Sequence, residues 1–85
     1  MQIIVYSTTT CPYCKMLKDY LTQRNNVFIE KQVDTDEAAK DEMMKKSGGY
    51  LGVPFSVVTK DNGEETRVVG FDRMKFDEIL GPQVL

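Results

Sequence analysis

The chain contains two cysteines, Cys11 and Cys14, which enclose a Pro-Tyr pair directly after an apolar run at residues 3–6. The apolar run predicts a buried strand, and residues 7–10 predict a short polar turn. Pro12 favours the first position of a helix, where its missing N–H costs nothing. Apolar residues at helical spacing follow on one face of that helix: Leu17, Tyr20 and Leu21. The two cysteines are therefore expected at a strand-to-helix junction, a setting typical of redox sites.

Cys11 is expected to be the more reactive of the two cysteines. It would cap the helix, with its sulfur facing the free backbone amides of Tyr13 and Cys14. The helix dipole and the charges of Lys15 and Lys18 would further stabilise a thiolate, so we expect a pKa in the range ~3.5–7.5, against ~8.5 for a free thiol. Cys14 begins the apolar face and has fewer free amides and less solvent around it. This makes Cys14 the expected resolving thiol.

Other uses of a cysteine pair at this spacing are less favoured. A structural disulfide would close a four-residue ring, which stabilises a fold by only about 2 kcal/mol, and nothing in the sequence indicates a secreted protein. A zinc site needs further Cys or His ligands, and the chain has no histidine and no third cysteine. Metal or cluster binding is left only at a site shared between subunits, so no metal site is expected within one chain. Two unrelated core cysteines are the third alternative, but a cysteine at a helix start is poorly placed for a core.

A length of 85 residues predicts one domain, spanning residues 1–85. Hydrophobic residues make up 41% of the chain and charged residues 28%, with a formal net charge of -2. This composition gives no electrostatic basis for binding nucleic acid or a membrane surface. No apolar stretch has the length of a membrane span or of a signal peptide. We therefore expect a globular protein of the cytoplasm, where free thiols persist.

Capping and turn signals predict the next two elements. Residues 25–26 are both asparagine and suit a left-handed turn after the first helix. Residues 27–33 alternate apolar and polar side chains, which predicts a strand. Asp34 and Glu37 have the spacing of a capping box, which predicts a second helix that runs to about Ser47 and ends at the two glycines after it.

The second half of the chain predicts a hairpin and a closing helix. Residues 55–59 and 66–69 are rich in β-forming side chains, and the Asp-Asn-Gly sequence at 61–63 between them is a strong hairpin signal. A final helix would begin at about Asp72 and end at the Gly-Pro pair 81–82. The order βαβαββα predicts an α/β fold with a four-stranded mixed sheet, flanked by three helices, in which the hairpin joins two parallel strands. That is the layout of the thioredoxin-like fold.

Three motifs in this order resemble the glutaredoxin family: Cys-Pro-Tyr-Cys at 11–14, Val-Pro at 53–54, and Val-Gly-Phe-Asp at 69–72. The resemblance covers essentially the whole chain. It implies a thiol–disulfide oxidoreductase that reduces protein disulfides and glutathione mixed disulfides, with Cys11 as nucleophile and Cys14 as resolver. It also implies a monomer that needs no metal and no tightly bound cofactor, with glutathione as a co-substrate.

The resemblance further implies how a substrate would be held. Pro54 would follow a cis peptide bond and face the cysteines, leaving the backbone of Val53 to pair with the chain of the substrate. Tyr13 would lie beside the bound thiol. The rest of the implied glutathione or substrate groove is Gly70, Phe71 and Asp72. From the residues alone, the Val-Pro motif also fits a plain turn at a strand start, Tyr13 a solvent-facing ring, and Asp72 a helix cap.

Three positions depart from the glutaredoxin pattern where glutathione would be held. Thr8 stands where many glutaredoxins carry a lysine, and Leu51 stands in a segment that often has a basic or amide side chain. Arg73 replaces one of two acidic residues that would contact the glutathione amino group. In this respect the chain is similar to the small glutaredoxin-like proteins that take electrons from thioredoxin reductase and feed ribonucleotide reductase. We therefore expect glutathione to be a poor reductant.

An alternative from another class is a binding module that holds an iron–sulfur cluster between two subunits, through Cys11 and glutathione. Pro12 argues against this alternative, because cluster-carrying relatives usually have a smaller and more open turn at that place.

Overall fold

The computed structural model describes residues 1–50 and 52–81 of the chain. Its elements are, in order, β1 (Gln2–Ser7), α1 (Pro12–Gln23), β2 (Ile29–Gln32), α2 (Glu37–Ser47), β3 (Phe55–Thr59), β4 (Glu65–Val69) and α3 (Arg73–Leu80). This order confirms the βαβαββα prediction and the thioredoxin-like fold.

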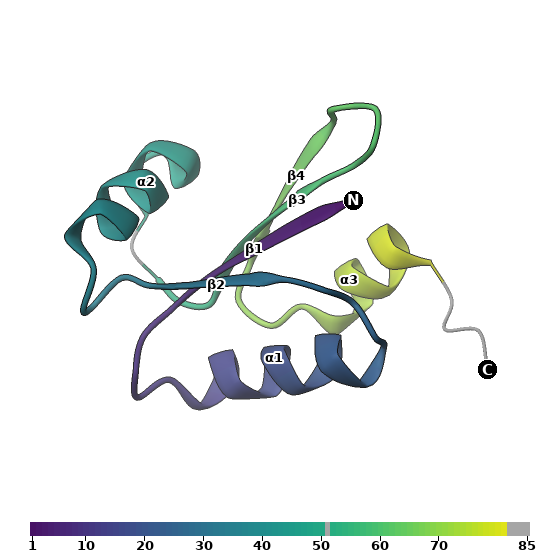
Figure 1. Ribbon diagram of the computed structural model, residues 1–85, viewed down its shortest axis with the longest axis horizontal. Coiled ribbons are helices and arrows are strands. Elements are labelled where there is room, and N and C mark those ends of the chain that lie inside the picture. Colours follow the sequence, from purple (N-terminus) through teal and green to yellow (C-terminus); the bar gives the residue numbers. More distant parts are fainter. Residues whose placement is uncertain (51, 82–85) are drawn as a thin grey trace.

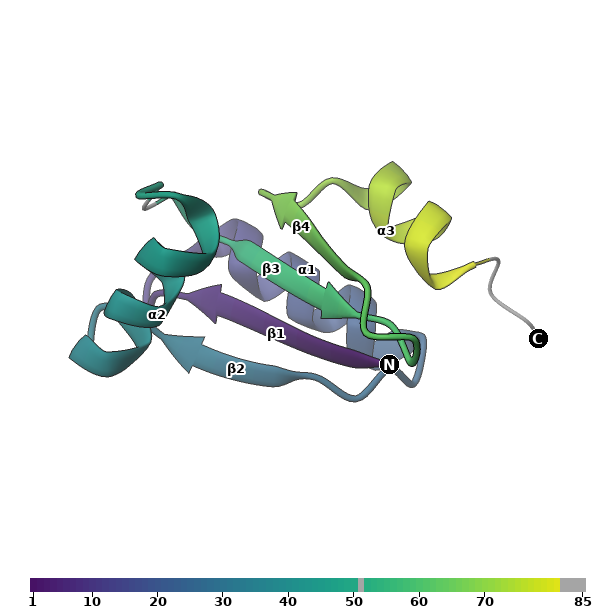
Figure 2. The ribbon, with the colours of Figure 1, turned by 90° about the horizontal axis from the view of Figure 1, so that it is seen from above.

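The strands form one mixed sheet in the order β2-β1-β3-β4. β1 and β2 are parallel, whereas β3 pairs antiparallel with both β1 and β4. Helices α1 and α3 cover one face of the sheet, and α2 covers the other (Figure 1). Figure 2 shows that β1 runs toward the edge at which α2 lies and that β3 starts from this edge. Segments far apart in the sequence are therefore brought together at the end of the sheet where β1 stops and β3 starts.

Each face of the sheet has its own apolar core. The core on the side of α1 and α3 consists of Ile3, Val5, Leu17, Leu21, Val58, Val68 and Phe76. The smaller core under α2 consists of Tyr6, Met43, Phe55 and Val57. Side chains of β1 alternate between the two cores, as the pleat of a strand requires.

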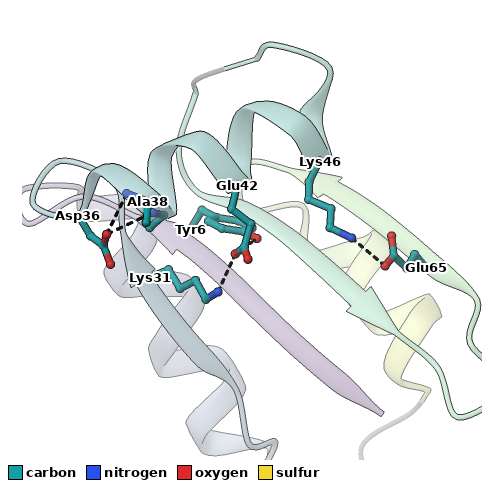
Figure 3. A network of polar contacts seen from close by, with 8 residues as sticks. Tyr6, Lys31, Asp36, Ala38, Glu42, Lys46 and Glu65 are labelled. Carbon is teal, nitrogen blue, oxygen red and sulfur yellow. Dashed lines mark hydrogen bonds and ion pairs between the residues drawn. The ribbon is translucent and has the colours of Figure 1, made fainter.

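A polar network ties α2 to the sheet within the second core. The Tyr6 hydroxyl donates to Glu42 Oε2 at 2.6 Å, and Lys31 Nζ lies 2.7 Å from the same oxygen. Figure 3 shows these three side chains converging from β1, α2 and β2. Near the end of α2, Lys46 pairs with Glu65 of β4 at 3.0 Å. The buried hydroxyl of Tyr6 thus has the hydrogen-bond partner that burial demands.

Helix α2 begins two residues later than the sequence indicated. Its N-cap is Asp36, whose Oδ1 accepts hydrogen bonds from the N–H groups of Ala38 at 3.0 Å and Ala39 at 3.3 Å. The predicted capping box of Asp34 and Glu37 is therefore wrong. An aspartate at either position could cap a helix, and Asp34 is bound by another loop, as described below.

Strand β2 is shorter than the strand predicted at residues 27–33. Only Ile29–Gln32 form the strand, and Val27 is 87% exposed. On either side of the strand, Phe28 packs against the core on the side of α1 and Val33 packs against the core under α2. β2 is an edge strand, so its alternating pattern has little apolar surface to pack against.

The predicted turns are confirmed where the backbone needs a positive φ. Asn25 has φ 58° after α1. In the β3–β4 hairpin, the N–H of Gly63 donates to the carbonyl of Lys60 at 2.8 Å, and Gly63 has φ 88°. The hairpin is thus closed by a turn followed by a left-handed glycine, a three-residue type of loop, and not by a two-residue Asn-Gly turn.

Candidate active site

Three segments meet at the edge of the sheet where β1 ends. Tyr6, near the end of β1, pairs with Phe55 at the start of β3, and Phe55 pairs with Val69 at the end of β4. The loop after β1, the residues before β3 and the residues after β4 therefore leave the sheet at the same edge. A hydrogen bond of 2.8 Å from the Gly70 N–H to the Pro54 carbonyl joins the last two segments. The site residues implied by the glutaredoxin resemblance thus lie on neighbouring segments.

Cys11 is the N-cap of α1, as the sequence predicts. Its backbone is extended, with φ -96° and ψ 110°, and its Sγ accepts a hydrogen bond from the Cys14 N–H at 3.1 Å. Of the two amides expected to face the sulfur, that of Cys14 makes the bond. A helix N-terminus and a donated hydrogen bond both favour negative charge on this sulfur.

The two cysteines are joined in a disulfide, with their Cα atoms 5.2 Å apart. Cys11 is partly exposed, whereas Cys14 is 1% exposed and faces the sheet. A substrate can therefore reach Cys11 from solvent, while Cys14 is covered by protein. This arrangement suits a pair in which the outer sulfur bonds to a substrate and the inner sulfur releases it.

Lys18, which the sequence analysis expected to support a thiolate at Cys11, forms an ion pair with Glu30. Its Nζ lies 2.7 Å from Glu30 Oε2, and the Ser7 hydroxyl donates to the same oxygen at 2.7 Å. Lys15 is exposed on α1. The stabilisation expected for a Cys11 thiolate therefore comes chiefly from the helix N-terminus.

The loop before Cys11 is held by a contact that the sequence analysis did not predict. Asp34 Oδ2 accepts hydrogen bonds from the backbone N–H of Thr9 at 3.0 Å and from its hydroxyl at 2.7 Å. These bonds stabilise the carboxylate and hold the pKa of Asp34 below its usual value. No local pattern signals the contact, because it depends on the parallel pairing of β1 and β2, which brings the two following loops together.

The Val53–Pro54 peptide bond is cis, as the family resemblance implies. The side chain of Pro54 is fully buried, and Val53 packs in part against the core under α2. Tyr13, by contrast, is 63% exposed, so its ring is available to a binding partner.

The segment after β4 combines backbone and side-chain contacts. Gly70 has φ 72°, and the ring of Phe71 packs edge-on against Tyr20 of α1, with the ring centroids 5.6 Å apart. Asp72 is the N-cap of α3, because its Oδ1 accepts a hydrogen bond from the Lys75 N–H at 3.1 Å. The capping role expected for Asp72 is confirmed, and it engages one oxygen of an exposed carboxylate.

The departures from the glutaredoxin pattern fall in this region as well. The guanidinium of Arg73 lies over the Tyr20 ring, 5.7 Å from its centroid. Thr8 is half-buried in the loop before Cys11, and Leu51 lies outside the described residues. A cation at position 73 repels an ammonium group that an acidic side chain would attract.

Large apolar side chains are exposed on elements that begin or end at the site. We refer to four of them as the apolar rim: Tyr13, Met16, Val69 and Met74, which are 63%, 50%, 55% and 81% exposed. A hollow between α1 and the segment after β4 is lined in part by Met16, Phe71 and Arg73. Of this rim, the sequence analysis identified Tyr13 but missed Met16, Val69 and Met74, because they lie on three separate elements and follow no common pattern.

Among residues 1–50 and 52–81, no group of three His, Cys, Asp or Glu side chains is arranged to hold a metal ion. None of the helices in this part of the chain has the length and apolar character needed to cross a membrane.

Known proteins share both the sequence pattern and the fold. The glutaredoxin family model matches residues 3–62. A glutaredoxin-like 8.6 kDa protein in a rubredoxin operon of Clostridium pasteurianum is 36% identical over 78 residues, which cover 92% of this chain and 96% of the relative. The crystal structure of the thioredoxin-like protein BC3987 has a TM-score of 0.76 and 30% identity, over 91% of this chain and 97% of the other.

NrdH-redoxin from Escherichia coli has a TM-score of 0.72 at 23% identity, over 96% of this chain and 97% of the other, and so shares its fold. The family match includes the Cys-Pro-Tyr-Cys motif at the start of α1 and extends through β3. From its dithiol motif, its fold and these relatives, the chain belongs to the glutaredoxin family.

Proposed function

We propose that this protein reduces disulfide bonds of other proteins by cycling between a Cys11–Cys14 dithiol and disulfide. The observation that carries this proposal is the asymmetry of the pair: Cys11 is partly exposed at the N-cap of α1, and Cys14 is 1% exposed behind it. Membership of the glutaredoxin family supports a thiol–disulfide oxidoreductase in general. A dithiol that must be regenerated also fits a reducing compartment such as the cytoplasm.

The chemistry proceeds in two exchanges. The Cys11 thiolate attacks one sulfur of the substrate disulfide, and the other substrate sulfur leaves as a thiolate and takes up a proton. Cys14 then loses its proton and attacks Cys11 Sγ, which forms the Cys11–Cys14 disulfide and releases the second substrate thiolate. Two electrons pass from the protein to the substrate, and the disulfide form of the structure corresponds to the end of this cycle.

The surface around Cys11 favours a protein as the partner. The four side chains of the apolar rim are exposed on elements that begin or end at the site, and exposed apolar surface of this kind suits the core of a protein interface. The backbone before Pro54 adds a position at which an extended substrate segment could pair. A small charged tripeptide would use the backbone position but not the apolar rim.

We further propose thioredoxin reductase as the electron donor, with a protein such as ribonucleotide reductase as an acceptor. Arg73 carries the wrong charge for the amino group of glutathione, and Asp72 already caps α3. The NrdH-redoxin neighbour is described as a glutaredoxin-like protein with a thioredoxin-like activity profile. Each missing charged contact would weaken glutathione binding by on the order of 1 kcal/mol or more.

Two coupled assays on one disulfide substrate, such as insulin, test the donor. NADPH oxidation is followed once through thioredoxin reductase and once through glutathione and glutathione reductase. We expect the faster turnover with thioredoxin reductase. Efficient turnover through glutathione alone would contradict the proposed donor.

A charge-reversal variant makes the same test at one residue. Arg73→Asp restores an acidic side chain and is expected to raise the glutathione-dependent rate by about tenfold, since a charged contact is worth roughly 1.4 kcal/mol or more. Lys45→Asp, which makes the same charge change on an exposed part of α2, should leave that rate unchanged.

An anaerobic preparation with the visible absorbance of an iron–sulfur cluster would instead favour the cluster-binding alternative.

A further inference from the structure

A second polar network lies on the other face of the sheet from the Tyr6 network. Glu30 Oε2 accepts a hydrogen bond from the Ser7 hydroxyl at 2.7 Å and lies 2.7 Å from Lys18 Nζ. Ser7 is fully buried, and the side chains of Lys18 and Glu30 are 30% and 27% exposed. The three residues come from the end of β1, from α1 and from β2. A buried hydroxyl is thus linked to a carboxylate that still reaches solvent.

The topology places this network on the face of the sheet that the buried side of α1 covers. Ile3 and Val5 of β1 share a core with Leu17 and Leu21 of α1, and Ser7 points to the same face because side chains alternate along a strand. Strand β1 and helix α1 run in opposite directions (Figure 2). The end of β1 therefore faces the start of α1, where Cys14 is the first buried residue of the helix.

Lys18 supports the same placement from the helix. It follows Cys14 by four residues, and residues four apart lie on the same side of an α-helix. Since Lys18 reaches Glu30 and Glu30 reaches Ser7, the network joins α1 to β2 and β1 on the face of the sheet that α1 covers.

We propose that Glu30 accepts the proton of Cys14, passed on through the Ser7 hydroxyl, when Cys14 attacks the mixed disulfide. This proposal rests on the proposed dithiol function. A buried thiol needs such help, because burial disfavours the thiolate that must attack. Ser7 would act as a relay and Lys18 as a positioning residue that holds the carboxylate in place.

The contacts of Glu30 keep its carboxylate in the ionised form. The Lys18 ammonium group and, to a smaller extent, the Ser7 hydroxyl hold the pKa of Glu30 below its usual value, although burial opposes them. Glu30 is therefore ionised at neutral pH. Because its side chain is 27% exposed, a proton taken from the interior can continue to water.

Other titratable groups around α1 are engaged elsewhere or exposed. β1 and β3 present no charged side chain to this core, and Lys15 and Asp19 of α1 are exposed. The remaining groups have partners of their own: Asp77 bonds to Tyr20 and pairs with Arg24, Asp34 binds Thr9, and Lys31 pairs with Glu42 on the opposite face. Glu30 is the carboxylate that the described contacts link to the buried start of α1.

The step balances without a further reactant. The Sγ–H of Cys14 gives its proton to Ser7 Oγ while Ser7 gives its own proton to Glu30 Oε2. The electron pair left on Cys14 Sγ forms the bond to Cys11 Sγ. The bond between Cys11 and the substrate sulfur breaks, that sulfur leaves as a thiolate, and Glu30 returns the proton to water.

Stopped-flow reaction of the reduced protein with 5,5′-dithiobis(2-nitrobenzoate) separates the two exchanges, because each releases one coloured thiolate. Attack by Cys11 depends on the reagent concentration, whereas attack by Cys14 does not. For the wild-type protein we expect the second rate constant to change little with pH in the neutral range. In Glu30→Gln we expect it to fall about 100-fold near pH ~6 and to recover as the pH rises.

Two further variants make this result specific. Glutamine keeps the shape of Glu30 and its hydrogen-bond acceptor but cannot take the proton, whereas Ser7→Ala breaks the relay and should give a smaller loss of the same kind. Glu42→Gln is the matched control, since Glu42 also accepts from a hydroxyl and a lysine, but on the opposite face. The Glu42→Gln protein should show the second phase with the rate constant of the wild type.

The outcomes separate this inference from the proposed function. A Glu30→Gln protein with the wild-type rate and pH profile would overturn the inference, as would an equal loss in Glu42→Gln. A wild-type protein with no concentration-independent second phase would instead overturn the resolving role of Cys14, and with it the proposed function.

Discussion

Cys11 and Cys14 are the same chemical group in two different environments. Cys11 lies at a helix N-terminus, is partly exposed and accepts a backbone hydrogen bond, whereas Cys14 is buried against the sheet. The first environment stabilises a thiolate and the second disfavours one. The different roles of the two sulfurs therefore follow from the positions of the two cysteines at the start of α1.

Alkylation of the reduced protein tests this difference at the residue scale. At pH ~6, iodoacetamide should label Cys11 well before Cys14, because the helix N-terminus favours the thiolate form of Cys11. Mass mapping of the labelled peptides identifies the site, and Cys14→Ser should label at the wild-type rate. Faster labelling of Cys14 would reverse the assigned roles.

Residue roles were predictable where the signal is local. Pro12 after Cys11 marked the N-cap, and Asp72 marked the start of α3, because capping depends on neighbours within one turn. The contacts of Glu30 with Ser7 and of Asp34 with Thr9 were not predictable. They depend on the register of two strands, which no local pattern specifies.

At the scale of elements, α2 shows how polar contacts fix a helix on a sheet. Glu42 receives the Tyr6 hydroxyl and pairs with Lys31, so one carboxylate joins α2 to both β1 and β2 (Figure 3). Lys31 and then Tyr6 hold the pKa of Glu42 below its usual value. The folded protein therefore favours the charged form of this side chain more than the unfolded chain does.

Glu42→Ala should lower the free energy of unfolding by about 1–3 kcal/mol at neutral pH, because the buried Tyr6 hydroxyl loses its acceptor. A lowered pKa stabilises the fold above the unfolded value of ~4.3, and this stabilisation is lost as the pH falls through the lower folded value. The decrease in the free energy of unfolding caused by Glu42→Ala should therefore be smaller at acid pH. Urea denaturation at neutral pH and at a pH below ~4.3 measures this loss of stability. Asp41→Ala, at an exposed neighbouring position, is the control. An equal loss at both pH values would contradict the assignment.

Element types were predictable, but some boundaries were not. The Asp-Asn-Gly turn and the apolar spacing of α3 identified the last two strands and the last helix. The start of α2 was misplaced because Asp34 and Asp36 are both competent caps, and only the contact of Asp34 with the neighbouring loop decides between them. The predicted strand 27–33 was too long because β2 lies at the sheet edge, where Val27 has nothing to cover it.

At the scale of the whole molecule, the sheet order assembles the site. Placing β1 between β2 and β3 brings the dithiol loop, the cis Val53–Pro54 bond and the Gly70 segment to one edge. The family resemblance predicted these residues as a group, although the periodicity of the sequence alone would not have joined them. Apart from Tyr13, the apolar rim was not predicted, because its other members lie on three separate elements that only the fold brings to the site.

Trapping the mixed disulfide shows whether Cys11 bonds to the substrate and Cys14 releases it. Reduced Cys14→Ser protein is incubated with insulin or oxidised glutathione, and the adduct is located by mass spectrometry. We predict a stable mixed disulfide on Cys11 in this variant, none in Cys11→Ser, and only a transient one in the wild type. An adduct on Cys14 of the Cys11→Ser protein, or disulfide reduction by that protein at the wild-type rate, would contradict these roles of the two cysteines.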